Sequence, residues 1–560
     1  MKTLYKIFLI LAVIAFTSCE EELTELNVNP NGVDPTVVNP NLVLPTVITG
    51  TADNYLNPNY QSHFAGVMQY IQKSGWSGAT NDFEWKGPTS WNSWYSNLRN
   101  AKHIYERADE MDMDFHKGAS LVLKAFNFGY IADTWGDAPY TNALNAAEGG
   151  EENYFPVYDT QETIYRGIIG ELKEANTLLS QSRASYQGIN PDADILYGGD
   201  PAKWRKFANT LMLRYYMRLS DKLPTFAKDG IEEIMSDPGT YPIFSSFEDD
   251  AGMPYSGTSL GDSWPRNKTF EQTDRGFERV QCAAGIRDVL MGYNDPRLDA
   301  WFNPVLVQIQ VSEDYPEGSV TVGSTRYVRP DYLTANNLVV YHPDNWVDDV
   351  AAGFELIDTN RYVGIPIASS ISDGSQYNLN PAPIQGGPNV HVSALDDLFK
   401  KPTDDKLLAR MITYAEACFI LAEAAEKTWN VGSGSQQDWY EKGIEASFDM
   451  WGVDGYDDYI TEAGVAYDGS LEQIIEQKWI ANWTIAHESW CDWRRTGFPQ
   501  LSWGDKGQRN SMPLRFQYGS GEISRNEQNY QTAVARLVET PFTAQDGKDS
   551  AWSKFWLLQD

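Results

Sequence analysis

The sequence has few residues of the kinds that build metal sites and disulfide frameworks. It contains four cysteines and six scattered histidines among 560 residues. If Cys19 serves as an anchor, as argued below, an odd number of cysteines remains, and a disulfide framework is not expected. His487 and Glu488 begin like a zinc-binding helix, but Cys491 stands where the second histidine belongs. We therefore expect neither a metal site nor a cofactor.

Basic residues are also scarce. Lys and Arg number 44 against 77 Asp and Glu, which gives a formal net charge of −33, and no basic cluster stands out. A nucleic-acid-binding protein neutralises phosphates with clustered cations, so nucleic acid is excluded as a partner. Self-repulsion should keep so acidic a chain monomeric unless a partner is supplied.

Long apolar runs are missing beyond the first residues of the chain. Lys2 and Lys6 precede an apolar run at 7–16, which is shorter than the about 20 residues that a membrane-spanning helix needs. Residues 1–18 therefore read as a signal peptide. The alternative for the cysteine that follows them, Cys19, is a chance residue after an ordinary signal peptide.

The stretch at 470–499 is predicted to form one long helix. Ser470 and Gln473 have the spacing of a capping box, and Gly497 supplies the left-handed residue that ends a helix. Trp479, Trp483, Ala486, Trp490 and Trp493 fall on one face at helical spacing. Such a stripe is a ligand platform or a packing ridge, and core packing is the favoured interpretation.

Several sequence blocks carry a family resemblance. The helix ending W-C-D-W-R-R-T-G-F-P at 490–499 resembles the signature helix of SusD/RagB-type nutrient-binding lipoproteins. Other blocks similar to this family, in its SusD-like branch, are D-T-W-G-D-A-P-Y at 133–140, Y-G-G-D-P-A-K-W at 197–204, N-D-P-R-L at 294–298, G-I-P at 364–366, Y-A-E at 414–416 and P-L-R-F at 513–516. The F-T-S-C box at 16–19 resembles a lipoprotein cleavage site, although Phe16 departs from the usual small aliphatic residue. The resemblance implies a lipidated Cys19, which several acyl chains would anchor stably. It also implies that the acidic run at 20–22 directs the protein to the outer face of the outer membrane.

The resemblance implies a mainly α fold, an α-superhelix of TPR-like helix pairs with a loop-rich insertion that carries a small β-sheet. Helical patterns occur at 60–72, 91–111, 118–134, 161–181, 201–221 and 408–427. Between about 245 and 402 the helical pattern lapses, and strands are expected at 305–311, 319–328 and 338–341. The expected organisation is a signal peptide at 1–18, an extended tether at 19–45 and a single domain at 46–560.

The function that the resemblance implies is capture of oligosaccharide and its delivery to a SusC-like, TonB-dependent outer-membrane transporter. The alternatives are a peptide receptor of the same transporter-lid type and, in a different class, a surface glycan hydrolase. The G-x-S-x-G pattern at 257–261 has loop sequence on both sides, so Ser259 is not expected to be a nucleophile. We expect a binding protein and not an enzyme.

The ligand site is sought among aromatics that helical packing does not claim. Aromatic residues make up 13% of the chain, and flat apolar rings suit sugar rings. Two loops, at 73–90 and 261–270, combine tryptophans with polar residues, and the family's glycan sites are similar. The predicted ligand-binding residues are Trp76, Asn81, Asp82, Trp85, Trp264 and Arg266. The alternative for each is a loop residue packed onto the body or a contact to the transporter.

Overall fold

The computed structural model describes residues 37–75, 77–273, 275–315, 318–369, 374–381, 383–384 and 387–560. The predicted signal peptide, Cys19 and Trp76 lie outside this part of the chain. In the described part, no helix combines the length and apolar character that crossing a membrane requires.

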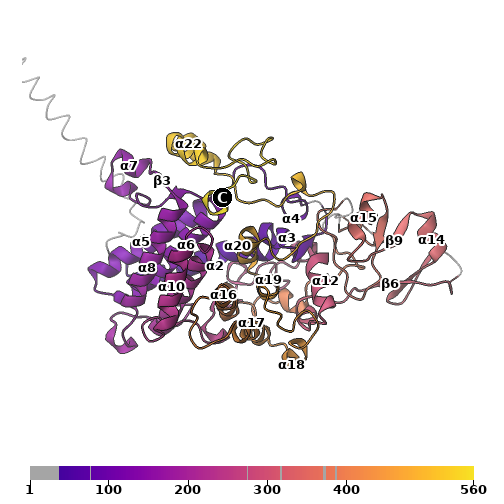
Figure 1. The fold of residues 1–560 in the computed structure, drawn as a ribbon, viewed down its shortest axis with the longest axis horizontal. Helices are drawn as coiled ribbons and strands as arrows, with labels where there is room; N and C mark the ends of the chain where they lie inside the picture. The colour runs from indigo at the N-terminus through magenta and orange to yellow at the C-terminus, as the bar shows by residue number, and fades with distance from the viewer. Residues whose placement is uncertain are drawn as a thin grey trace, which may run out of the picture.

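Helices that pack in sequence order form one end of the molecule and continue into its centre (Figure 1). These helices are α5 Asn92–Glu110, α6 Asp114–Trp135, α8 Gln161–Leu178, α9 Pro201–Arg218 and α10 Pro224–Ser236, and each after α5 packs against the one before it. Helix α2 (Pro40–Gln61) packs against α5 and α6. A second group in the centre comprises α16 Tyr414–Glu426, α17 Gln436–Trp451, α19 Leu471–Ala481 and α20 Ala486–Thr496. The predicted mainly α fold of helix pairs is confirmed.

The start of α2 differs from the sequence-based expectation. Residues 40–45 were expected to be extended, but the Asn39 side chain accepts a hydrogen bond from the Asn41 amide and Pro40 occupies the first helical turn. An Asn cap followed by Pro is a helix-starting signal, and α2 then accommodates Pro45 and Pro58 inside it. The helix predicted at 60–72 is wrong, because α2 ends at Gln61. The short α3 (His63–Val67) follows, and then β1 (Ile71–Lys73) pairs with β5 (Val280–Cys282).

The insertion lies at the opposite end of the molecule and carries small sheets (Figure 1). Strands β6 (Gln308–Val311), β8 (Thr325–Val328) and β7 (Ser319–Val322) form a three-stranded sheet in the order β6-β8-β7. Strand β9 (Leu338–Val340) pairs in parallel with β10 (Glu355–Ile357). The predicted strands are confirmed in part, because only 308–311 of the range 305–311 forms a strand and the range 319–328 forms two strands, whereas 338–340 matches the prediction at 338–341. The helix predicted at 408–427 is shorter, because Ala409–Ile412 forms β11, which pairs with β4 (Ala251–Met253).

The long helix predicted at 470–499 is broken in the middle. The Ser470 cap and the left-handed Gly497 are both present, but α19 ends at Ala481 and α20 begins at Ala486, with Thr484 at φ 73° between them. The Trp483 ring stacks on Trp301 at 5.6 Å, and tertiary packing of this kind overrides helical propensity. The Gln473 carboxamide accepts from the Asp468 amide, so it does not complete a capping box.

The tryptophans of this stretch are mainly core residues, as predicted. Trp479, Trp483 and Trp490 are fully buried, whereas Trp493 is only partly buried. The side chains of Trp479 and Trp490 also donate to backbone carbonyls of Met68 and Pro513. These contacts hold α19 and α20 against the residues that follow α2 and against the C-terminal segment.

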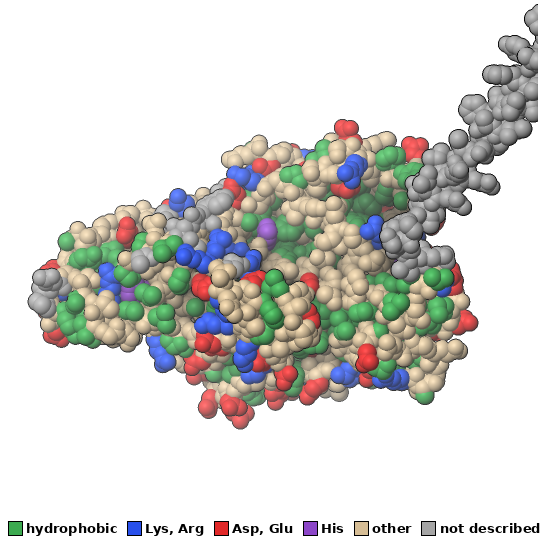
Figure 2. All heavy atoms as spheres, turned by 180° about the vertical axis from the view of Figure 1, so that it is seen from behind, with side chains coloured by type: hydrophobic (Ala, Val, Ile, Leu, Met, Phe, Trp, Pro, Cys, Tyr) green, Lys and Arg blue, Asp and Glu red, His purple; other side chains and the backbone are tan. Residues whose placement is uncertain are grey.

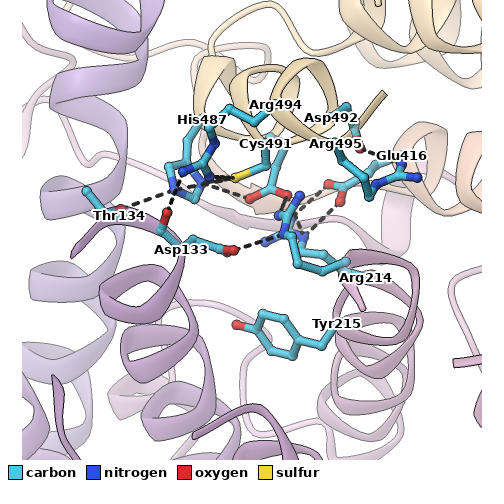
Figure 3. A network of polar contacts seen from close by, with 12 residues as sticks. Asp133, Thr134, Arg214, Tyr215, Glu416, His487, Cys491, Asp492, Arg494 and Arg495 are labelled. Atoms are coloured by element: carbon cyan, nitrogen blue, oxygen red, sulfur yellow. Dashed lines mark hydrogen bonds and ion pairs between the residues drawn. The ribbon is translucent and has the colours of Figure 1, made fainter. Parts of the chain in front are cut away.

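A buried ion-pair network joins α6, α9, α16 and α20 (Figure 3). It consists of Asp133, Arg214, Arg218, Glu416 and Glu488, all of them buried. Arg214 forms two hydrogen bonds to the Glu416 carboxylate, at 2.7 and 2.6 Å, and Arg218 lies 2.9 Å from Asp133. Both arginines also pair with Glu488. The signature helix α20 thus serves as a structural junction of the fold.

Candidate ligand-binding groove

A groove of about 410 Å³ opens where α2 ends and α3 begins. Its described lining comes from the last turns of α2, from the start of α3, from β1, from the start of α5, from the end of α6 and from three loop segments, at 89–90, 266 and 516. These lining residues are Asn54, Asn57, Pro58, Gln61, Ser62, His63, Lys73, Thr89, Ser90, Ser93, Trp94, Tyr130, Trp135, Arg266 and Phe516. On the face drawn in Figure 2, the surface is hollowed near its centre, and Lys and Arg side chains gather at the border of the hollow.

Aromatic side chains form the inner part of the groove. Trp94 stacks on Tyr130 with ring centroids 4.0 Å apart and an interplanar angle of 21°. The Trp135 indole donates to the Thr89 carbonyl at 3.1 Å, which fixes the ring. Trp94 is 4% exposed, so its ring is held by the core and offers only a limited edge to a ligand. Tyr130 and Trp135 are 4% and 1% exposed, so the groove presents ring edges, which are able to contact the C–H groups of a sugar ring.

Polar side chains form the rim. Asn57 and Ser93 are exposed, and Asn54 lies half-buried beside them. Gln61, which is buried, accepts a hydrogen bond from Nε of Arg266 at 3.1 Å. Burial lowers the pKa of His63 to about 4, with a smaller contribution from Lys73, so this imidazole is neutral at pH 7. Amides and hydroxyls at the rim of an aromatic groove are able to exchange hydrogen bonds with sugar hydroxyls.

Lys73 brings a charge into the groove from a well-defined backbone. The Lys73 amide donates to Asn81 Oδ1 at 3.0 Å, and Asn81 Nδ2 donates to the Lys73 carbonyl at 2.8 Å. Burial, with smaller contributions from repulsion by Arg279 and Arg266, lowers the pKa of the Lys73 ammonium to about 8. At pH 7 the side chain remains mostly protonated.

The predicted site residues take different positions relative to the groove. Arg266 lines the groove, and Asn81 acts behind it by holding the Lys73 backbone. Trp85 is 5% exposed and packs against Phe516 and His63, beneath the groove lining. Asp82 is half-buried and is not among the lining residues.

The structure contradicts the prediction that Trp264 contacts a ligand. Its exposed fraction is 0%, its ring packs against Tyr60 and Phe399, and its amide donates to the Pro402 carbonyl at 2.8 Å. The segment around residue 402 covers this loop, so the indole has no face available to a ligand. The prediction relied on the polar residues of the loop at 261–270, which do not reveal that Tyr60 and Phe399 bury the ring.

Sequence reasoning missed the groove residues of α2 and α5. Asn54, Asn57 and Gln61 lie in α2, which the sequence does not predict with these bounds, and Trp94 falls within the helical pattern at 91–111. One available signal was the D-T-W-G-D-A-P-Y block at 133–140, which contains Trp135 and ends α6 at the groove.

A buried cluster of possible metal ligands lies behind the groove in α6 and α20. Single ligand atoms of Asp133, His487 and Cys491 lie within 4.8 Å of one another. Two guanidinium groups already contact them, since Arg218 lies 2.9 Å from Asp133 and Arg494 lies 3.0 Å from the Cys491 sulfur. Burial also raises the pKa of the Cys491 thiol, which opposes the thiolate that a metal requires. The donor set therefore fits an ion-pair network better than a cation site.

A second cavity, of about 530 Å³, lies on the insertion side of the molecule and has a mainly apolar lining. It is formed by segments around Phe277, Asn303, Leu306 and Val392, with Lys400 at its edge. Its described lining has one aromatic residue, Phe277, and it includes the carboxylates of Glu278 and Asp397.

Comparisons with known proteins identify the family and the fold of the chain. The SusD-like family profile, described as starch-binding and associating with the outer membrane, matches residues 32–327 and 361–519. The chain is similar to the solved structures of a SusD homologue from Bacteroides fragilis (20% identity, TM-score 0.67, covering 93% of this chain and 100% of that one) and of a chitin-binding SusD homologue from Flavobacterium johnsoniae (20% identity, TM-score 0.66, covering 92% and 99%). It is also similar to a structure titled chitin-binding protein (23% identity, TM-score 0.65, covering 93% and 100%). No curated protein matches the chain.

Proposed function

The chain belongs to the SusD-like family, and on that premise we propose that it binds oligosaccharide in the groove described above. The family is described as starch-binding and associated with the outer membrane. Two of the similar solved structures are described as chitin-binding. In this proposal the protein is a receptor at the cell surface, and a lipid on Cys19 anchors it in the membrane.

The observation that carries the proposal is the combination of aromatic and polar groups in one groove. Trp94 and Tyr130, each 4% exposed, offer fixed ring edges to the groove, and Asn57 and Ser93 lie at the rim with exposed polar groups. Sugar rings present apolar C–H faces and a hydroxyl edge, so both parts of the groove have a counterpart in the ligand.

The lining also favours binding over hydrolysis. Glycosidases use a pair of carboxylates on either side of the scissile bond, and the described lining contains no Asp or Glu. Ser259 lies in a loop just before the short 3₁₀ turn Leu260–Asp262, which is not the strand–turn–helix setting of a nucleophile elbow.

Delivery of the ligand to a TonB-dependent transporter is the further part of the proposal, and it rests on the family resemblance. The protein would lie as a lid on the transporter barrel, release ligand toward the pore and face the cell exterior. Purification from native membranes in mild detergent should bring down a large β-barrel protein. A monodisperse monomer in repeated preparations would count against this partnership.

Binding itself is tested by incubating the purified protein with a panel of polysaccharides. Depletion of one polysaccharide from solution without release of reducing ends is the expected result, whereas release of reducing ends would support the hydrolase alternative.

Replacing the exposed Asn57 with Trp should fill the groove and abolish depletion. The matched control is Gln437→Trp on the exposed face of α17, which should bind as the wild type does. Binding of peptides and of no polysaccharide would favour the peptide-receptor alternative.

A further inference from the structure

The second cavity, of about 530 Å³, has a buried amide side chain in its lining whose oxygen is unsatisfied. This residue, Gln281 of β5, is 1% exposed. Its Oε1 atom is enclosed and has no hydrogen-bond partner within the described part of the chain. Folded proteins contain few buried polar atoms without a partner, because leaving one unsatisfied is costly. Such an atom in the wall of a cavity points to a ligand that completes its hydrogen bonding.

The other two amide side chains of the described lining are fully occupied. Asn389 is 3% exposed; its Nδ2 atom donates to two backbone carbonyls at 2.7 and 2.8 Å, and its Oδ1 atom accepts from a backbone amide at 2.9 Å. Asn303 donates to a backbone carbonyl and to the Asp397 carboxylate, both at 3.1 Å. These two amides hold the cavity wall in place. Gln281 differs from them because its amide oxygen takes no part in the wall.

The register of β5 places Gln281 on the cavity side of its sheet. Gln281 lies opposite Gln72 of β1 and forms an antiparallel bridge with Ala394 on its other side. Directly paired residues project from the same face of a sheet, and Ala394 is itself a lining residue. Gln72 is fully buried, and both polar atoms of its side chain also lack partners. The sheet beside the cavity therefore carries two neighbouring amides with unused hydrogen-bonding capacity.

The rest of the lining is apolar, and its charges are paired. The apolar side chains are Phe277, Pro304, Leu306, Pro388 and Val392. Lys400 pairs with Asp397 at 2.6 Å, and one oxygen of Glu278 pairs with Lys268 at 3.0 Å. Leu306 is 70% exposed, which places an uncovered apolar side chain where the cavity opens. These features favour a neutral ligand with an apolar group.

Hydrogen-bonding capacity narrows the class of ligand further. Besides Gln281, the cavity wall offers Oε2 of Glu278, an enclosed acceptor without a partner. A sugar ring would bring several hydroxyls to an apolar wall with few partners for them, and burying unsatisfied hydroxyls is unfavourable. A peptide residue brings one N–H, one carbonyl and its side chain. A glutamine amide offers both a donor and an acceptor, which match the two polar groups of a peptide unit.

We propose that this cavity is a second ligand site, separate from the groove, and that it binds an apolar residue of a neutral peptide. The apolar side chain of the ligand lies against Val392 and Leu306, and its backbone exchanges hydrogen bonds with Gln281. The volume of the cavity falls within the range of about 300–1,000 Å³ that is typical of small-ligand sites. This site adds to the proposed saccharide binding in the groove and does not depend on it.

The test measures the binding of neutral dipeptide amides by calorimetry. N-acetyl-leucyl-leucinamide should bind at least tenfold more tightly than N-acetyl-seryl-serinamide, which keeps the backbone and lacks the apolar side chains. Chitobiose, which carries acetamido groups on sugar rings, should not displace the leucyl probe. Displacement by chitobiose, equal affinity of the two dipeptides or no binding of the leucyl probe would overturn the proposal.

A variant of Gln281 separates a ligand-binding amide from a structural one. Gln281→Met should weaken binding of the leucyl probe about tenfold, as expected for one lost hydrogen bond, without lowering Tm, because its unsatisfied amide oxygen has no partner to lose. The matched control is Gln161→Met. Gln161 is 0% exposed, donates to the Ala132 carbonyl at 2.8 Å and accepts from the Leu557 amide at 3.1 Å. This control should lower Tm and bind the probe as the wild type does.

Surface variants test the position of the site. Leu306→Asp should weaken binding of the leucyl probe at least tenfold, whereas Leu42→Asp, at a leucine that is 72% exposed on α2, should have no effect. Asn57→Trp, which fills the groove, should leave affinity for the probe unchanged. Loss of probe binding in Asn57→Trp would place the peptide in the groove and overturn the proposal. A Gln281→Met protein that melts early and binds the probe normally would also overturn it.

Discussion

Replacement of Glu488 by Gln tests the buried ion-pair network. Burial alone would raise the pKa of Glu488, but Arg214 and Arg218 lower it well below its ordinary value of 4.5, so the carboxylate is ionised. Removing one partner of a buried ion pair typically costs about 3–5 kcal/mol. Arg214 keeps Glu416 and Arg218 keeps Asp133, so we expect the lower end, about 3 kcal/mol.

The loss is measured by urea denaturation and by calorimetry. Unfolding entropy of about 2.1 cal/mol/K per residue over about 500 residues converts 3 kcal/mol into a fall in Tm of about 3 °C. The control, Glu445→Gln, changes an exposed carboxylate on α17 and should leave Tm unchanged.

The pH dependence has a definite sign. Because the folded-state pKa of Glu488 is lowered, its contribution to stability is complete above the unfolded pKa of about 4.5 and is lost as the pH falls toward the folded value. The difference between wild type and Glu488→Gln should therefore be largest near neutral pH and narrow below about pH 4.5. A variant that unfolds with the wild-type midpoint at neutral pH would refute the structural role assigned to this network.

Three further predictions concern the anchor, the core and the groove. Cys19→Ala should move the protein from the membrane fraction to the soluble fraction, and unchanged membrane retention would refute the lipoprotein assignment. Trp264→Ala should destabilise the fold by about 3–5 kcal/mol while the folded fraction still binds ligand; normal melting with weakened binding would reverse our correction. Affinity for the bound oligosaccharide should fall as the pH rises through about 8, where Lys73 loses its proton next to Arg266, Arg279 and His63 and keeps fewer N–H groups to donate to sugar hydroxyls. Lys73→Met should remove this dependence, and equal slopes in both proteins would contradict it.

Local signals in the sequence predicted the ends of elements better than their interiors. The Ser470 cap and Gly497 mark the start of α19 and the end of α20, because caps and left-handed glycines act within one turn. The break between these helices depends on Trp483 stacking on Trp301, a contact between distant parts of the chain. No local pattern carries such information.

The groove was only partly predictable for a similar reason. Arg266 was found because loops that carry polar residues often bind ligands. Trp264, two residues earlier, was misplaced because the segment around Pro402 covers it. The rim residue Asn57 lies in α2, whose Asn- and Pro-rich start was interpreted as extended, and its position beside Arg266 follows only from the packing of the whole chain.

A crystal structure of the protein with its tightest-binding oligosaccharide is the most direct test of the central claim. We predict a sugar ring against the exposed edge of Trp94, with its hydroxyls bonded to Asn57 and Ser93. Ligand density in the second cavity, near Phe277 and Leu306, with the groove empty, would contradict this assignment of the site.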